Sequence, residues 1–505
     1  MNRYMDETRS VAELINTRIQ IVIPSILAEG ETFSAGISVT GSDALPLAGT
    51  GHTLNLENSM GIEGLPSTFR LDPGESTGAI TGLEATGPET ALIRARVEGT
   101  GIRGRTADIT SNPAWVFKDP PYRLFWGDIH VHTSYSNCHA WRCLDPEWCY
   151  MYARDVSLLD FAAPADHLRG IVSDRKRWPR LQELARSCNE PNRFVTFLAF
   201  ESSHAQGWGG DNNVYYLDDD APYFWVERED MHGTAPRVHL RDLWKQLDGN
   251  KKAYFTIPHH TGRARKYRSW DEDYYDPERE PLFEIYSSWG SSEKRHSRLP
   301  VSGGNNEAPS YFVDALKAGT RFGVMASSDD HATLPGGVHH HRIEPFRNPT
   351  LNGFSHKGLS AVRTGELTRE SLFRAMRQRN VYASTHSRSI VDMKVNDIPM
   401  GREAPADKAL NSGRTVRVLF TPDVAPGGKI ILMRNGEEFA SMTAGGPEAM
   451  AAVNEVLFRD DEPLEKAALR DSKFHPEPFV VYYARIESSD GSHQWTSPVW
   501  IDVGK

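Results

Sequence analysis

The sequence predicts an α/β fold, in which a barrel of alternating strands and helices lies between two β-sandwich-like domains. Three observations predict it: apolar runs that end on histidine or acidic residues, helical stretches between those runs, and period-two patterns near both ends of the chain. Strands that alternate with helical stretches are typical of parallel βα units. We therefore divide the chain into residues 1–120, 121–389 and 390–505.

The first and last domains are predicted to be β-rich. In the first domain, apolar residues alternate with other residues from Thr32 to Val39, which is the pattern of a half-buried strand. In the last domain, Asn435-Gly436 and Asp490-Gly491 each separate two strand-like segments. Such pairs are strong signals for β-hairpins. We expect both domains to have a sandwich-like architecture.

The middle segment is predicted to be a β/α barrel, because its apolar runs have the length and composition of buried strands. The six runs are Leu124–His132, Leu158–His167, Phe194–Glu201, Ala253–His260, Leu282–Tyr286 (with Glu284 inside it) and Phe322–His331. The helical stretches are Pro146–Val156, Lys176–Asn189, Leu240–Leu247, Ser310–Lys317 and Thr368–Asn380. The carboxyl ends of barrel strands meet at the active site, so the histidines and acids of these runs are expected to converge. Of the 19 histidines, 16 lie between His130 and His386, which also places catalysis in this segment.

Composition excludes several classes of function. The formal net charge of -10 and the isoelectric point near 6.0 argue against a general binder of nucleic acids or anionic membranes, because such binding depends on clustered Lys and Arg. No apolar run approaches the ~20 residues that span a bilayer, and residues 1–10 lack the apolar core of a signal peptide. We therefore expect a cytoplasmic protein that acts on a small molecule.

The chain has neither a Gly-x-Ser-x-Gly elbow nor a P-loop, which disfavours a serine hydrolase and a nucleotide kinase.

The pair His130-Val131-His132 is the first candidate for a metal site. Residues i and i+2 of a strand point to the same side, so the two histidines can grip one ion together. Imidazole and carboxylate ligands suit zinc, manganese or iron. Glu201 follows a run so apolar that an unpaired carboxylate would be costly to bury, and a cation explains it better. Alternatively, any single strand-end histidine could be a core residue that bonds a backbone carbonyl.

The order of the motifs resembles the polymerase and histidinol phosphatase (PHP) superfamily of metal-dependent hydrolases. The matching stretches are Gly127–Thr133, Ala165–His167, Glu201, Pro258–His260 and Ser328–His331. Among the branches of this superfamily, the chain is most similar to the one that contains carbaryl hydrolase-like proteins. The resemblance covers about residues 122–390. It implies a distorted (βα)7 barrel with two or three divalent metal ions (Zn, Mn or Fe).

The resemblance also implies roles for individual residues. Asp329 would hold one ion together with the two histidines of the first motif, and Glu201 would bridge this ion to a second one held by His259. His167 and His331 would face a further ion or the substrate. The implied metal ligands are His130, His132, His167, Glu201, Asp211, His259, Asp329 and His331.

Two positions depart from the pattern of the superfamily. Asp211 stands in Gly209–Asn213 where relatives usually have a histidine, and an oxygen ligand shifts a site toward harder ions.

The four cysteines do not have the spacing of a CxxC zinc knuckle, and a reduced set of thiols is the simpler interpretation. Cys138 is the exception, because some relatives place a ligand of the third ion at this position. Occupancy of that third site stays open.

We expect hydrolysis of an ester, carbamate or amide bond of a small molecule by a metal-bound hydroxide. Two neighbouring ions can lower the pKa of a shared water and polarise the bond under attack. His260 or His204 is the candidate proton donor to the leaving group. Arg263 or a second ion would steady the oxyanion.

Two alternatives stay open. The wider superfamily and a basic run favour a phosphoesterase, although such a run is usually a solvated surface. Tryptophans near the strand ends favour an apolar or aromatic substrate instead. The other alternative is a catalytically inactive module whose flanking β-domains bind a carbohydrate or a protein. The basic residues are Arg263, Arg265, Lys266 and Arg268, and the tryptophans are Trp208, Trp225, Trp270 and Trp289.

Overall fold

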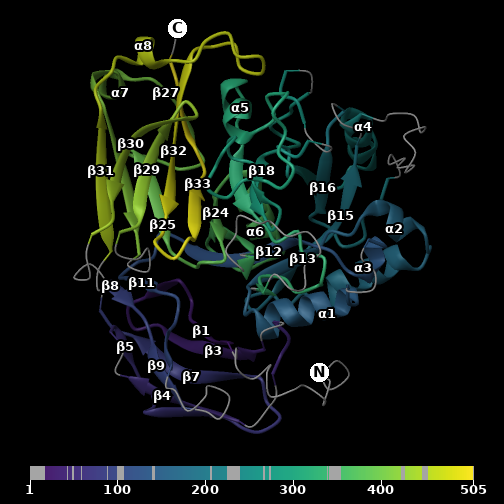
Figure 1. Cartoon of the computed structure of the whole chain (residues 1–505), viewed down its shortest axis with the longest axis vertical. Coiled ribbons are helices and arrows are strands. Elements are labelled where there is room, and N and C mark those ends of the chain that lie inside the picture. Colours follow the sequence, from purple (N-terminus) through teal and green to yellow (C-terminus); the bar gives the residue numbers. More distant parts are fainter. Residues whose placement is uncertain are drawn as a thin grey trace.

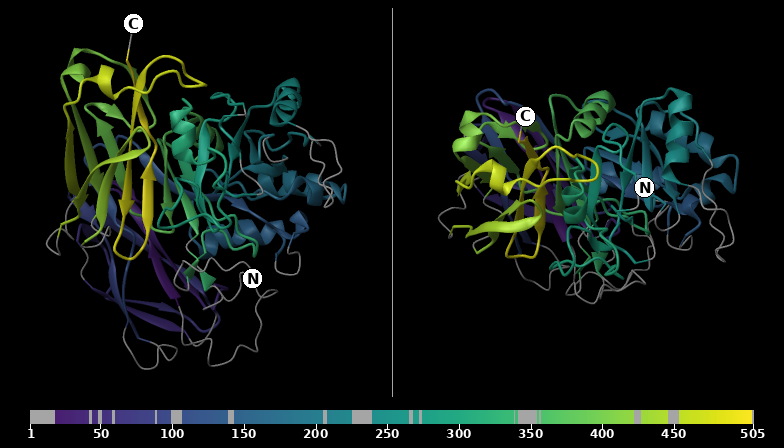
Figure 2. Two further views of the ribbon diagram at one scale, coloured as in Figure 1. Left: turned by 45° about the horizontal axis from the view of Figure 1, so that its top comes forward. Right: turned by 90° about the horizontal axis from the view of Figure 1, so that it is seen from above.

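A computed structural model of the chain describes residues 18–41, 44–47, 51–57, 60–87, 89–98, 107–138, 143–204, 208–224, 239–264, 268–271, 274–337, 339–340, 354–355, 357–421, 427–445 and 453–503. The N-terminal strands lie at one end of the molecule (Figure 1). The middle and C-terminal segments lie side by side next to them, as the further views also show (Figure 2).

Two antiparallel sheets and one short mixed sheet form the N-terminal part of the molecule. One sheet has the strand order β1-β3-β7-β5, a second has β10-β9-β4-β6, and a short third sheet has β2-β11-β8. Phe33, Ala35, Ile37 and Val39 of β3 are buried in one core with Leu54 of the second sheet, because side chains along a strand alternate between its faces. The strands are β1 (Arg18–Val22), β2 (Ile26–Ala28), β3 (Thr32–Thr40), β4 (His52–Glu57), β5 (Ile62–Glu63), β6 (Thr68–Leu71), β7 (Thr77–Ala85), β8 (Glu89–Ala91), β9 (Arg94–Glu98), β10 (Ala107–Thr110) and β11 (Ala114–Phe117).

The middle segment contains most of the helices and shorter strands. Its strands are β12 (Arg123–Val131), β13 (Phe161–Pro164), β14 (Val195–Thr196), β15 (Leu198–Ser203), β16 (Asp211–Tyr216), β17 (Tyr254–Pro258), β18 (Leu282–Ser287), β19 (Gly290–Ser291), β20 (Gly323–Ala326), β21 (His339–His340), β22 (Phe354–Ser355), β23 (Gly358–Thr364) and β24 (Val381–Thr385). Its helices are η3 (Ser134–Ser136), α1 (Pro146–Met151), η4 (Tyr152–Val156), α2 (Leu168–Val172), α3 (Arg177–Ser187), α4 (Leu240–Asn250), α5 (Phe312–Lys317) and α6 (Arg369–Arg377). Helix α6 is capped by Thr368, whose hydroxyl accepts a hydrogen bond from the backbone N–H of Ser371, as helix N-caps do. Within the described ranges, no helix is both long enough and apolar enough to cross a membrane.

The prediction of a (βα)7 barrel is wrong, because the chain is mostly β-sheet and its strands lie in several mixed or antiparallel sheets. Strand β12 pairs in parallel with β13 but antiparallel with β23, and β15, β16 and β17 form an antiparallel sheet. Strands β18 and β20 pair in parallel. An apolar run shows that a strand is buried, but it does not show the direction of the neighbouring strand. Strand β16 was not predicted either, because its residues Asp211–Tyr216 are largely polar or aromatic.

The C-terminal segment shares its largest sheet with the middle segment. An 11-stranded sheet has the order β14-β13-β12-β23-β24-β33-β32-β29-β30, and β34 and β27 extend from β32. A four-stranded sheet, β26-β25-β28-β31, is not hydrogen-bonded to it but shares a hydrophobic core with it. Both expected hairpins, β29–β30 and β32–β33, are present. The elements are β25 (Val391–Val395), β26 (Ile398–Pro399), β27 (Glu403–Pro405), α7 (Lys408–Ser412), β28 (Arg414–Phe420), β29 (Lys429–Arg434), β30 (Glu437–Thr443), β31 (Asn454–Asp460), α8 (Leu464–Ala467), β32 (Phe479–Glu487), β33 (His493–Thr496) and β34 (Val499–Asp502).

The ends of several strands of the middle segment nevertheless meet. Val131 at the end of β12 forms an isolated parallel bridge with Asp330, which follows β20. His167, which follows β13, forms another with Glu201 in β15. Each bridge brings together two segments of the chain that are distant in sequence.

Candidate metal centre

Histidine and acidic side chains from six strands or strand ends meet in one cluster. Seven of them are buried, and the other two, His167 and His331, are half-buried. All eight predicted metal ligands belong to the cluster, together with His260. Its members are His130, His132, His167, Glu201, Asp211, His259, His260, Asp329 and His331.

The first group of possible metal ligands is His130, His132 and Asp329, whose ligand atoms lie within 4.8 Å of one another. Oδ1 of Asp329 lies 3.1 Å from Nε2 of His132 and 3.4 Å from Nε2 of His130. Two imidazoles and one carboxylate that converge in this way form a ligand set typical of zinc, manganese or iron.

Glu201 lies between this group and a second one. The second group is His130, Glu201 and His259. Oε1 of Glu201 lies 3.4 Å from Nε2 of His259, and Oε2 lies 3.3 Å from Nε2 of His132. Oε2 is also 3.1 Å from Nδ1 of His167. The two oxygens of one carboxylate therefore face different sets of imidazoles, which is the position of a bridging ligand.

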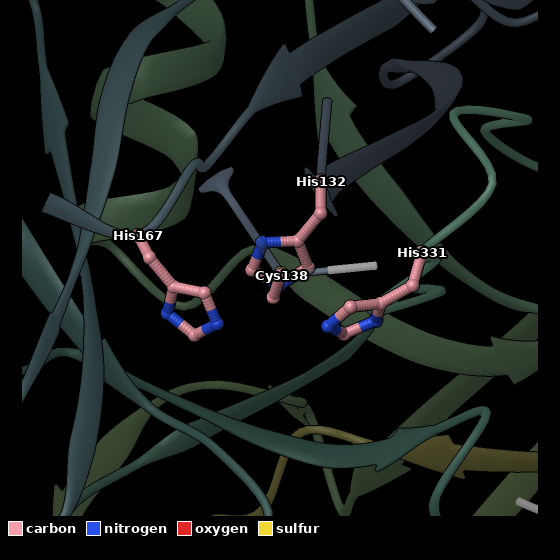
Figure 3. A group of neighbouring side chains, drawn as sticks. All are labelled: His132, Cys138, His167 and His331. Atoms are coloured by element: carbon pink, nitrogen blue, oxygen red, sulfur yellow. The ribbon is translucent and has the colours of Figure 1, made fainter. Parts of the chain in front are cut away.

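A third group contains a thiol. His132, Cys138, His167 and His331 have ligand atoms within 4.8 Å of one another, and the three imidazole rings surround a common space (Figure 3). His331 is oriented by the hydrogen bond that its Nδ1 donates to the backbone carbonyl of Asp329, at 3.0 Å. Thiolate and imidazole together favour softer ions such as zinc.

A fourth group places His260 among the ligands. It consists of Asp211, His259 and His260. Nε2 of His260 bonds Oδ2 of Asp211 at 2.9 Å, and Nδ1 lies 3.3 Å from Oδ2 of Asp329. Both ring nitrogens of His260 therefore face carboxylates, an arrangement that the sequence did not indicate.

The backbone is strained at two residues of the cluster. Asp329 has φ 48° and His260 has φ 32°, a left-handed region that residues other than glycine rarely adopt. Such strain costs of order 1–3 kcal/mol per residue and is found mainly at functional sites. In this molecule it turns two ligand side chains into the cluster.

Several buried ligand atoms have no hydrogen-bond partner among the described residues. They are Nε2 of His130, Nδ1 of His167, both ring nitrogens of His259, Nδ1 of His260, Oε2 of Glu201 and Oδ2 of Asp329. Buried polar atoms without a partner are rare and costly. Bound cations would satisfy those that face the cluster, while a neutral His259 would keep a proton on one of its two ring nitrogens, so the residues present fit divalent metal ions.

Polar residues behind the ligands orient two of the imidazoles. Nδ1 of His130 donates to Oε2 of Glu284 at 2.9 Å. Nδ1 of His132 lies 2.8 Å from the hydroxyl of Ser136, which itself donates to Oδ1 of Asp166 at 2.7 Å. Both histidines therefore present Nε2 to the cluster, and such supporting bonds are usual around metal ligands. The sequence places Glu284 inside a predicted buried strand, which does not by itself indicate a supporting role.

Two further carboxylates hold the segment that carries Asp329. The carboxylate of Asp128 accepts hydrogen bonds from the backbone N–H groups of Ser328 at 3.0 Å and Gly336 at 2.9 Å. Asp330 accepts one from Leu334 N–H at 2.7 Å and pairs with the buried Lys357. These bonds fix the backbone on both sides of Asp329.

The charged groups of the cluster shift one another's pKa. Burial alone would lower the pKa of His130, but the carboxylates of Asp329 and Glu284 reverse this and raise it well above its usual value. Burial would raise the pKa of Glu201, but His167 and His130 hold it well below its usual value. The pKa of Asp329 is lowered in the same way. The cluster is therefore built for ionised carboxylates that need positive charge nearby.

The remaining predicted catalytic residues lie at the edge of the cluster. His204 is buried and its Nε2 lies 3.2 Å from the hydroxyl of Ser202, and it belongs to none of the four ligand groups. The guanidinium of Arg263 stacks 4.1 Å from the ring centroid of Trp289. The rings of Trp289 and His331 pack edge to face, with 6.0 Å between their centroids.

Other residues of the expected substrate region have structural positions. Arg268 is buried and pairs with Glu280 at 2.6 Å, and Trp270 is fully buried in a hydrophobic core. Trp208 packs near His239, with 5.9 Å between ring centroids. Arg265, Lys266 and Trp225 lie outside the described residues.

No protein-family model matches the chain. It is 26% identical to an uncharacterized protein of Chlamydia pneumoniae over 401 residues, and 26% identical to one of Chlamydia trachomatis over 404 residues. Each match covers 78% of this chain and 60% of the relative, so the chain spans less than two thirds of their length. These relatives bring no known activity to the comparison.

Two solved structures resemble the chain only weakly. A CARDB domain from Pyrococcus furiosus matches with a TM-score of 0.14 and 16% identity, over 21% of this chain and 98% of that domain. A cycloisomaltooligosaccharide glucanotransferase from Paenibacillus matches with a TM-score of 0.24 and 9% identity, over 96% of this chain and 71% of that enzyme. Scores this low assign neither fold nor function.

Proposed function

We propose that this protein is a metal-dependent hydrolase that cleaves an ester, carbamate or amide bond of a small molecule. The observation that supports this most strongly is the set of buried ligand atoms without hydrogen-bond partners in the described part of the chain. A relationship with the PHP superfamily stays a prediction that rests on the order of the motifs, since no family model matches. The cytoplasmic location also stays a prediction.

The cluster has ligands for two or three cations. His130, His132 and Asp329 would hold one, and Glu201 with His259 would hold a second. The group that contains the Cys138 thiol would hold a third. When bound, neighbouring divalent cations activate a water molecule and polarise the oxygen of the bond under attack.

His260 supplies a proton near the site of bond cleavage. Burial would lower the pKa of His260, but its contacts with Asp211 and Asp329 raise it above the usual value. We therefore assign to Nε2 or Nδ1 of His260 the proton that the leaving group takes up. His204 is less suited to this role, because its Nε2 lies next to Ser202 and it belongs to none of the ligand groups.

Arg263 and Trp289 supply a surface for the substrate. Among the described residues, no carboxylate forms an ion pair with Arg263, whose guanidinium instead stacks on Trp289. The charge of Arg263 is close enough to His260 to lower the pKa of that residue. A guanidinium in this position can hold the developing oxyanion of an ester or carbamate, while the indole packs against an apolar leaving group.

Two other functions remain as alternatives. Arg263 would equally hold a phosphoryl group, which supports a phosphoesterase. A catalytically inactive module that binds a carbohydrate or a protein is the other alternative, because no family model matches the chain and the Chlamydia relatives are uncharacterized.

Elemental analysis and a substrate panel test these functions together. The purified protein is expected to contain at least two equivalents of Zn, Mn or Fe and to hydrolyse one class within a panel of aryl esters, aryl carbamates and aryl phosphates. A chelator should abolish turnover, and added metal should restore it. Turnover that resists the chelator would contradict the proposal. A protein that holds metal but turns over no substrate would support the binding module, and a preference for aryl phosphates would select the phosphoesterase.

A further inference from the structure

A cavity of about 620 Å³ lies where the three segments of the chain meet. Its walls come from β11 of the N-terminal part, from β23 and α6 of the middle segment, and from β25, β26 and β28 of the C-terminal segment. Strand β11 lies at the junction between the N-terminal strands and the C-terminal segment (Figure 1). None of the candidate metal ligands lines this cavity.

The cavity has an excess of positive charge. Four basic side chains line it, Arg363, Arg374, Lys394 and Arg402, and Asp392 is the only acidic one in the described lining. Asp392 is already used, because Arg363 Nη1 donates to its Oδ1 at 2.6 Å. No carboxylate in the described ranges forms an ion pair with Arg374, Lys394 or Arg402. Three cations therefore face this space without a counter-charge.

The pKa of Arg402 reflects its burial and the excess of positive charge in the cavity. One of its nitrogens, Nη2, donates to Oδ1 of Asn380 at 3.0 Å, which leaves its positive charge uncompensated. Burial, and then repulsion from Arg379 and Arg363, lowers the pKa of Arg402. A bound anion would offset this repulsion.

Aromatic side chains form another wall of the cavity. The rings of Trp115 and Phe117 pack edge to face, with 6.3 Å between centroids. The guanidinium of Arg363 lies 5.2 Å from the ring centroid of Tyr122. Nε1 of Trp115 is buried and has no hydrogen-bond partner among the described residues. The lining thus combines apolar surface and uncompensated cations, as sites for small organic ligands do.

We propose that this cavity binds a small organic anion with an aromatic ring, whose acidic group pairs with Arg402 and Lys394 while its ring packs on Trp115 and Phe117. Because the binding residues come from all three segments, the occupied cavity ties these segments together and raises the unfolding temperature. This site is independent of the metal centre and of the hydrolase activity proposed for it.

Calorimetric titration of the full metal-loaded chain with 2-naphthalenesulfonate tests the proposal. This probe carries both a ring and a charge, whereas inorganic sulfate carries only the charge and 2-naphthol only the ring. We expect one molecule to bind per chain, and we expect sulfate and 2-naphthol to bind at least tenfold more weakly. Absence of binding, or equal binding of sulfate, would overturn the proposal.

Two variants locate the bound probe. Arg402→Gln and Lys394→Gln are each expected to weaken binding about tenfold, and Lys394 is exposed, so that its replacement should not impair folding. Arg417→Gln is the matched control, because Arg417 lies on neighbouring β28 but pairs with Glu455 and does not line the cavity. Unchanged affinity in Lys394→Gln, or loss of binding in the metal-site variant Asp329→Asn, would overturn the proposal by placing the probe elsewhere.

Discussion

Two buried clusters of charged side chains in this molecule differ in how their polar atoms are satisfied. Glu293 lies at the junction of the middle and C-terminal segments and is 1% exposed. Its Oε1 accepts from Tyr483 at 2.8 Å and from Arg485 at 2.9 Å, and its Oε2 accepts from Trp495 at 2.9 Å. Arg485 also pairs with two further glutamates. This network is complete without any ligand.

The metal centre is equally buried but incomplete. Glu201 and Asp329 each keep one oxygen without a hydrogen-bond partner among the described residues, and both ring nitrogens of His259 are in the same state. A satisfied polar network rigidifies a fold, whereas an unsatisfied one costs free energy unless a ligand completes it. The contrast indicates that the Glu293 cluster stabilises the molecule and that the Glu201 cluster is kept for binding.

The largest effect is expected for Asp329→Asn. This change removes a charged ligand from the first group, so turnover should fall by several orders of magnitude and at least one equivalent of metal should be lost. Metal content by elemental analysis and kcat on the best substrate measure it. Asp314→Asn is the matched control on α5, outside the cluster. If Asp329→Asn kept both its full metal content and its full turnover, the contrast between the Glu201 cluster and the Glu293 cluster would have no basis.

Glu293→Gln is expected to act on stability alone. Removal of one partner from a buried ion pair leaves the other charge uncompensated and costs ~3–5 kcal/mol. The free energy of unfolding from urea titration measures this loss, and metal content should not change. Glu437→Gln is a control at an exposed ion pair, where the free energy should change by less than about 0.5 kcal/mol. A loss of metal in Glu293→Gln would show that the two clusters are coupled.

Glu284→Gln is expected to have an intermediate effect on metal binding. The carboxylate of Glu284 holds Nδ1 of His130 at 2.9 Å, and loss of such a supporting group typically lowers metal affinity ~10–100-fold. Competition with a metal-binding dye measures the affinity. Exposed Glu278 provides the control variant Glu278→Gln. An unchanged affinity would mean that the position of His130 does not depend on Glu284.

The smallest effect is expected from pH. The pKa values of His130 and His167 are raised well above the usual value in the metal-free protein, where burial is outweighed by nearby carboxylates. A histidine with a raised pKa stabilises the folded metal-free protein when it is protonated. This contribution to stability is complete below the unfolded pKa of about 6.5, and it is lost as the pH rises through the folded pKa. Metal ions compete with those protons, so metal affinity should increase with pH. The gap between the unfolding temperatures of metal-loaded and metal-free protein should therefore widen from about pH 6 to about pH 8.5, and a constant gap would contradict this.

Much of the candidate site could be predicted from the sequence, because its ligands lie at recognisable positions. His130 and His132 lie at the end of an apolar run, and Asp329 and His331 follow another. Polar side chains at the end of a buried strand are costly to bury without partners, so the pattern indicated convergence even without the correct sheet order. His260 as a neighbour of Asp211 was not predicted, because this contact depends on the antiparallel pairing of β16 with β17.

The arrangement of the sheets could not be predicted in the same way. The run Leu124–His132 gave no sign that β12 would pair antiparallel with β23, more than two hundred residues later. Buried strands of either direction have similar apolar runs when both faces are covered. The predicted barrel therefore failed on pairing direction, a property that depends on contacts between distant segments.

The pairing of β24 with β33 has a practical consequence. These strands join through residues such as Ala383 and Trp495, so the sheet continues across residue 389. A fragment truncated at that residue would leave the backbone groups of β24 as an open edge. Open edges recruit strands from other molecules. Expression of the middle segment alone should therefore give aggregates, and co-expression with residues 390–505 should rescue it.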